Sequence, residues 1–71
     1  MRDGVWGEVL IQFVVNKRGC VMQAEVIWEV DVRLDAEALR VIRASRFEPA
    51  QEAGEAVAVV MTMPIGFYVR L

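Results

Sequence analysis

Residues 56–71 read AVAVVMTMPIGFYVRL, and this stretch decides the fold. Every second residue from Val57 is apolar, which places Val57, Val59, Met61, Met63, Ile65, Phe67 and Val69 on one face of an extended chain. The opposite face carries Ala58, Val60, Thr62, Pro64, Gly66 and Tyr68. A period of two predicts a long final β-strand over residues 56–70. Pro64 has no N–H to give to a ladder, so we expect this strand at a sheet edge or at a bulge.

An edge strand leaves a row of backbone N–H and C=O groups unpaired. Such a row can add an extended segment of another polypeptide to the sheet. It can equally pair two copies of the same chain, either side by side or by exchange of the last strand about Gly54. Both uses of the final strand follow from the same pattern, and we expect this domain to dimerise, with strand exchange as the favoured form.

Two further strands are predicted before residue 31, as a hairpin over residues 7–30. Residues 8–16 alternate, with Val9, Ile11, Phe13 and Val15 on the apolar face. The polar run 16–19 ends in Gly19, which suits a type I turn with a glycine bulge. In the second strand one face is expected to point inward, unless a bulge changes the register: Cys20, Met22, Ala24, Val26 and Trp28. Residues 1–6 form a leader in which Trp6 is expected to cover one end of the core.

The period changes from two to between three and four after residue 33, which predicts an amphipathic helix over residues 34–45. Asp35 is the expected N-cap residue, because a carboxylate there can accept from the free N–H groups of the first turn. Pro49 restricts Glu48 to extended geometry, so the helix must end before it. Residues 50–55 are expected to form a flexible connector with Gly54 as its hinge.

The composition excludes several classes of function. The 71 residues make one small domain, in which a core typically supplies only about 3–5 kcal/mol of stability. One cysteine and no histidine rule out an internal disulfide and argue against a transition-metal site, and no cofactor is expected. The net charge of −2, without a basic patch, argues against nucleic acid as a partner. No pair of carboxylates or nucleophile with a base is apparent, so we expect no enzymatic activity.

The order of these features resembles the C-terminal domain of the TonB energy-transducing family, over residues 7–69. The most specific part is Arg46-Phe47-Glu48-Pro49, followed by a glycine and a long last strand. The residues that match the family pattern or its structural positions are Gly7, Phe13, Gly19, Asp35, Ala38, Leu39, Phe47, Pro49, Gly54, Pro64 and Phe67. The helix that commonly precedes the first strand, the membrane anchor and the proline-rich linker of the family have no counterpart in these residues. We therefore expect a terminal fragment or an excised domain.

The resemblance implies an α+β fold, a three-stranded antiparallel sheet in the order β-β-α-β with one helix on one face. It implies a periplasmic domain at the end of a protein anchored in the inner membrane, where a proton-channel complex supplies energy. Its partners would be outer-membrane TonB-dependent transporters, whose TonB box adds as a strand beside the last strand. That edge maps to Ala58, Val59, Val60, Met61, Thr62 and Met63, with Pro64 at its end. The alternative is an interaction or dimerisation domain of a TonB-like membrane sensor or peptidase-like protein.

Overall fold

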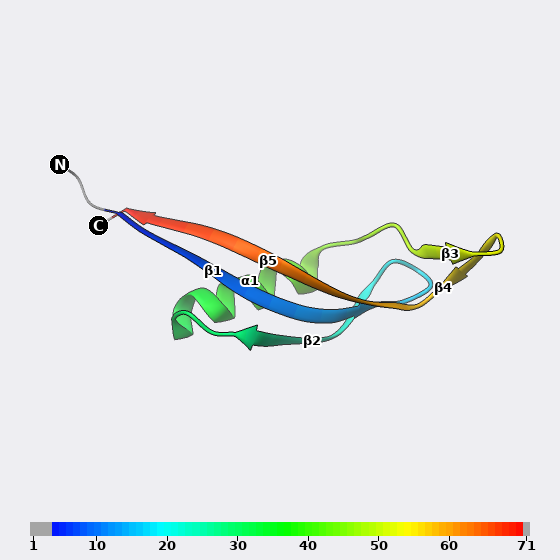
Figure 1. The fold of residues 1–71 in the computed structure, drawn as a ribbon, viewed down its shortest axis with the longest axis horizontal. Coiled ribbons are helices and arrows are strands. Elements are labelled where there is room, and N and C mark those ends of the chain that lie inside the picture. Colours follow the sequence, from blue (N-terminus) through cyan, green and yellow to red (C-terminus); the bar gives the residue numbers. More distant parts are fainter. Residues whose placement is uncertain (1–3, 71) are drawn as a thin grey trace.

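A three-stranded antiparallel sheet, one helix and a short two-stranded hairpin make up the described part of the domain (Figure 1). In the computed structural model, which describes residues 4–70, the central strand β1 (Gly4–Val15) lies between β2 (Val21–Trp28) and β5 (Val59–Arg70). Helix α1 (Val32–Ala44) follows β2, and two short strands, β3 (Ala50–Glu52) and β4 (Glu55–Val57), precede β5. The expected α+β class, with a three-stranded antiparallel sheet and one helix, is confirmed.

The core lies between the sheet and α1. Alternate side chains of β1 supply most of it, because the central strand is flanked on both sides and covered by the helix: Val9, Ile11, Phe13 and Val15 are at most 1% exposed. Ala38 and Ile42 are the buried residues of α1, at helical spacing. The helix packs on β2 and β1, and the apolar face of β5 is half-buried beside it. The side chain of Val69, expected on that face, lies outside the described residues.

The turn between β1 and β2 has the predicted geometry. Gly19 has a φ of 83°, and its N–H donates to the Asn16 carbonyl at 2.9 Å. The Asn16 side chain accepts from the N–H groups of Arg18 and Cys20, both at 2.9 Å, and so satisfies the donors inside the turn.

Strand β2 departs from the predicted alternation. Gln23 has a φ of 53°, and the pairing with β1 shifts register twice, between Gln12 and Val14 and between Leu10 and Ile11. The expected inward positions of Met22 and Trp28 are wrong, since these residues are 48% and 65% exposed. The turn places Val21 opposite the buried Val15, so Met22, opposite Val14, already faces away from α1. The first shift then turns Ala24 and Val26 inward, and the second places Trp28 opposite Leu10 on the outer face. The inner face of β2 is supplied by Val21, Ala24 and Val26, and Cys20 is half-buried at a bridge to Arg46.

The helix begins earlier than predicted, and its N-cap is Asp31 rather than Asp35. A side-chain oxygen of Asp31 accepts from the Arg33 N–H at 2.9 Å. Asp35 lies in the first turn, where its carboxylate accepts from the Val30 N–H at 3.1 Å and ties the preceding loop to the helix. The helix ends at Ala44, with Ser45 as C-cap.

The connector over residues 50–55 is a β-hairpin and not a flexible segment. β3 and β4 pair through a two-residue turn in which Ala53 and Gly54 have φ values of 53° and 81°, as a type I′ turn requires. This hairpin extends beyond the sheet (Figure 1) and contributes to the elongated shape, 54 × 20 × 17 Å. The radius of gyration is 14.5 Å, against about 11 Å for a compact chain of this length.

The expected leader, residues 1–6, lies partly outside the described residues. Residues 4–6 belong to β1, which is longer than predicted. Trp6 does not cover the core: it is 77% exposed and packs on Tyr68, with ring centroids 4.7 Å apart.

Candidate functional site

The outer edge of β5 is the candidate site. β5 pairs with β1 continuously, from Val15 opposite Val59 to Gly4 opposite Arg70. Within residues 4–70 no strand pairs with its other side, because the sheet order ends at β5. The final strand is therefore an edge strand, as Pro64 predicts.

Pro64 also determines which backbone groups face outward. It stands opposite Leu10 in an unbroken register, and a proline without an N–H fits there only if its nitrogen faces away from β1. The N–H and C=O of one strand residue point to the same side, and the side alternates along the strand. Val60, Thr62, Gly66 and Tyr68 therefore direct their N–H and C=O groups to the open edge, while Met61 and Met63 direct theirs to β1.

The two faces beside this edge differ. On the helix side, Met61, Met63, Ile65 and Phe67 are half-buried and pack against the core. On the opposite face, which α1 does not cover, Val60 is 61% exposed and Tyr68 is 48% exposed. From Val59 to Tyr68 the strand carries no charged residue. The edge thus lacks the lysines and inward charges that commonly prevent strand pairing, and Pro64 is its one interruption.

The predicted partner-binding residues lie together with one exception. Val59, Val60, Met61, Thr62 and Met63 are consecutive in the first half of β5. Ala58 lies between β4 and β5, outside both strands. The β3–β4 hairpin leads directly into this half of the edge, so Gly54 is at the tip of a turn rather than at a hinge.

The Arg46-Phe47 motif has a structural role. The Phe47 N–H donates to the Gly19 carbonyl at 2.9 Å, and a side-chain nitrogen of Arg46 donates to the Arg18 carbonyl at 2.7 Å. A Cβ added to Gly19 would overlap the Phe47 carbonyl oxygen, so only glycine permits this approach. The Phe47 ring packs on Phe13, with centroids 5.3 Å apart. The motif fixes the chain after α1 to the β1–β2 turn.

Other residues of the family pattern are also structural. A Cβ on Gly7 would lie 3.0 Å from Cγ1 of Val30, so glycine lets the loop before α1 approach β1. Ala38 is fully buried on the inner face of α1, where a larger side chain would separate the helix from the sheet. Leu39 and Phe67 pack against the core, and Pro49 is half-buried before β3.

The charged pairs of the described residues lie on α1, away from the β5 edge. Hydrogen bonds from the backbone and side chain of Arg33 lower the pKa of Asp31 below its ordinary 3.8. A hydrogen bond from Arg40 lowers the pKa of Glu37, and the same contact raises the pKa of Arg40. In the part of the chain that the structure describes, no three His, Cys, Asp or Glu residues are grouped to hold a metal ion. None of the described helices is both long and apolar enough to cross a membrane.

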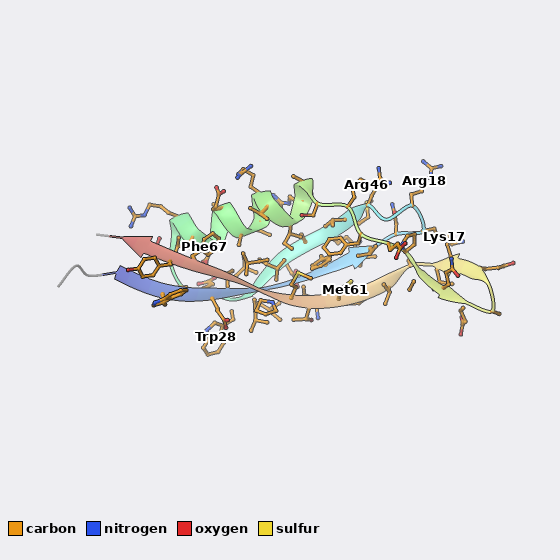
Figure 2. The ribbon with its side chains drawn as sticks, turned by 90° about the horizontal axis from the view of Figure 1, so that it is seen from above. Lys17, Arg18, Trp28, Arg46, Met61 and Phe67 are labelled. Carbon is orange, nitrogen blue, oxygen red and sulfur yellow. The ribbon has the colours of Figure 1, made fainter. Side chains whose placement is uncertain are left out.

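The uncovered face of the sheet carries a second feature that the sequence pattern did not predict. A groove of about 600 Å³ lies near the Trp6 end of β1, where β2 no longer pairs with it, and is lined by Trp6, Gly7, Glu8, Leu10, Trp28, Val30 and Gly66. Figure 2 shows Trp28 projecting on the side of the sheet opposite α1. The second register shift in β2, between Leu10 and Ile11, places Trp28 opposite Leu10 on this face, and a strict alternation could not reveal it.

Comparison with curated proteins and with solved structures gives no match. A family model described as the Gram-negative bacterial TonB protein C-terminal domain matches residues 1–69, nearly the whole chain. Its members are non-catalytic protein-interaction domains, periplasmic in Gram-negative bacteria. The sheet order, the Gly19–Phe47 approach and the long edge strand lie within the matched residues. The chain therefore belongs to the family of TonB C-terminal domains.

Proposed function

We propose that this domain captures an extended segment of a partner protein by β-strand addition to the outer edge of β5. The observation that supports it is the edge itself: twelve residues long, paired on one side, and without charge from Val59 to Tyr68. Backbone groups of Val60 and Thr62 would supply the hydrogen bonds. The five consecutive residues Val59–Met63 would form the main contact, and Pro64 would limit pairing beyond them.

The family suggests the partner. Outer-membrane transporters with a TonB box are the proposed partners, and the domain would couple energy from the inner membrane to them from the periplasm. The alternative is an interaction domain of a TonB-like sensor or peptidase-like membrane protein. A longer protein that carries this domain would distinguish the two: a single anchor helix with a proline-rich spacer before the domain would favour the transporter role. Several membrane helices with a zinc-peptidase motif favour the alternative.

Strand addition suits a protein that must pull on its partner. Backbone hydrogen bonds each contribute about 0.5–1.5 kcal/mol, with modest demands on partner sequence. A force along the strands loads neighbouring bonds together rather than one after another. Side chains that alternate between the two faces of the added strand would contribute selectivity.

The test is a titration of the domain with a TonB-box-like peptide, compared between wild type and Val60→Pro. The substitution removes one outward N–H and leaves a partner carbonyl unsatisfied, which costs about 1–3 kcal/mol. The expected loss of affinity is roughly 5- to 150-fold. Val60→Thr is the matched control, because it changes the side chain and keeps the N–H.

Urea unfolding of the same variants separates binding from folding. The N–H of Val60 faces away from β1, so Val60→Pro should change the urea midpoint little. Equal affinity of the proline and threonine variants, at unchanged stability, would argue against strand addition at this edge.

A further inference from the structure

The groove at the Trp6 end of β1 has lining residues from Trp28 and Val30 on one side to Gly66 of β5 on the other. Its lining includes Gly66, the residue opposite Glu8 in the β1–β5 register. Because Gly66 has no side chain, β5 leaves an opening above its backbone at this position. Each neighbouring outward position of β5 has a side chain, Pro64 on one side and Tyr68 on the other.

Glu8 lies over this opening. A Cβ built on Gly66 would have Cγ of Glu8 as its near neighbour, at 4.0 Å. Glu8 is thus the cross-strand neighbour of position 66, with its side chain in ordinary van der Waals range of a Cβ there. A strand added to β5 would lie about 4.8 Å beyond Gly66, which brings its side chains within reach of the Glu8 carboxylate.

Aromatic rings stand on both sides of Glu8. Trp6 and Tyr68 pack together on one side, and Trp28 stands opposite Leu10 on the other. Trp6 and Trp28 are 77% and 65% exposed, so their rings remain accessible. A carboxylate between exposed aromatic rings is an environment that favours an organic cation, through an ion pair and through cation–π contact.

The charge distribution favours the same ligand. The charged side chains on the β1 and β2 part of this face are Glu8 and Glu25. The basic side chains that the structure describes lie elsewhere, in the 16–19 turn, on α1 or just after it: Lys17, Arg18, Arg33, Arg40, Arg43 and Arg46. Figure 2 shows Lys17, Arg18 and Arg46 at the turn end of the sheet.

We infer that the groove over Gly66 is a side-chain specificity site, and that it takes a lysine or arginine of the captured peptide. This inference rests on the proposed strand addition. A peptide that pairs along residues 59–63 continues past Pro64. The peptide residue two positions beyond the one beside Pro64 lies about 6.6 Å further along the strand, beside Gly66. Its long cationic side chain crosses Gly66, meets the Glu8 carboxylate and stacks against Trp6 or Tyr68.

The test is an arginine scan of a TonB-box-like peptide, with norleucine at the same position as the uncharged reference. At one position arginine should bind roughly 3- to 10-fold more tightly than norleucine, and the preference should fall with added salt. Glu8→Gln should remove it. Glu25→Gln, the same change on the same face outside the groove, should leave it intact.

Gly66→Val provides a second variant, because it fills the opening without requiring a new backbone conformation and suits a strand. It should remove the arginine preference and leave the norleucine peptide bound. A peptide that is sensitive to Val60→Pro but shows no arginine preference dependent on Glu8 would overturn the specificity site and leave the proposed function standing.

N-acetyl-arginine amide tests the groove without a peptide strand. In NMR titrations it should shift the Trp6 and Trp28 indole signals more than N-acetyl-norleucine amide does, and Glu8→Gln should abolish the difference. If peptides fail to bind while this probe still gives that difference, strand addition fails and the cation site remains. Equal shifts from the two amides would overturn the site.

Discussion

Gly19 and Gly54 provide a matched pair of substitutions to alanine. Both have positive φ, 83° and 81°, so both variants force a side chain into the left-handed region. That conformation costs an L-residue about 1–2 kcal/mol, partly offset by about 0.4–1 kcal/mol because alanine has less freedom when unfolded. A Cβ on Gly54 meets nothing within 4 Å. Gly54→Ala should therefore cost about 0–1.6 kcal/mol.

Gly19→Ala adds a steric effect to the same backbone strain. Its Cβ would overlap the Phe47 carbonyl oxygen, so the chain after α1 must move away from the turn. The movement breaks the Phe47-to-Gly19 hydrogen bond of 2.9 Å and the Arg46-to-Arg18 hydrogen bond of 2.7 Å. At about 0.5–1.5 kcal/mol for each bond, added to the backbone cost, the total for Gly19→Ala is about 1–4.6 kcal/mol.

Urea unfolding, followed by far-UV circular dichroism, measures both variants. A domain of this size typically has about 3–5 kcal/mol of stability from its core, so Gly19→Ala should be partly unfolded without denaturant. Gly54→Ala should keep a clear folded baseline. Equal costs for the two variants would refute the structural role that we assign to the Gly19–Phe47 approach.

Three further predictions concern the helix cap, the core and self-association. Hydrogen bonds from Arg33 lower the pKa of Asp31 in the folded state. The ionised Asp31 therefore contributes its full stabilisation above the ordinary pKa of 3.8, and this stabilisation is lost as the pH falls through the lower folded-state pKa. Asp31→Asn, which keeps a capping oxygen, should therefore lower the urea midpoint at neutral pH and converge with wild type in acid; a constant difference would contradict this. Phe13→Ala removes a ring that is 1% exposed, at a cost of about 3–5 kcal/mol, and should leave the chain largely unfolded by circular dichroism; cooperative unfolding near the wild-type midpoint would show that Phe13 is not central to the core. Copies of this chain should pair along their open β5 edges, so sedimentation at micromolar concentration should give a species of twice the 8.0 kDa monomer mass. The dimer fraction should be smaller for Val60→Pro, and a wild type that sediments only as a monomer would rule out this pairing.

The final strand was predictable because a single feature, the two-residue period, extends over the whole of β5, and Pro64 places it at an edge. The 16–19 turn was predictable because it ends in a glycine that needs positive φ. These two elements locate the candidate binding edge from sequence.

The faces of β2 were not predictable from periodicity. Gln23 adopts a φ of 53°, which few residues other than glycine favour, and the sequence gives no local signal for it. The turn places Met22 opposite Val14 and so on the outer face, and each register shift then moves the following side chains to the other face, so Ala24 and Val26 point inward and Trp28 is exposed. The groove on the uncovered face was missed for the same reason.

The predictions of the helix start and of the connector over residues 50–55 were wrong for local reasons. Asp31 and Asp35 are both acceptable capping residues one helical turn apart, and the choice depends on where the β2 chain leaves the sheet. The Ala53-Gly54 turn lacks the Asn-Gly or Asp-Gly signature of a type I′ hairpin, so the β3–β4 pairing gave no sequence signal.

Amide hydrogen exchange by NMR tests the β5 edge most directly, because it reports on individual N–H groups. With a TonB-box-like peptide bound, the amides of Val60 and Thr62 should exchange more slowly than in the free domain, while those of Met61 and Met63, which already face β1, should change little. A bound peptide that leaves Val60 and Thr62 unprotected, or that protects β2 instead, would contradict strand addition at β5.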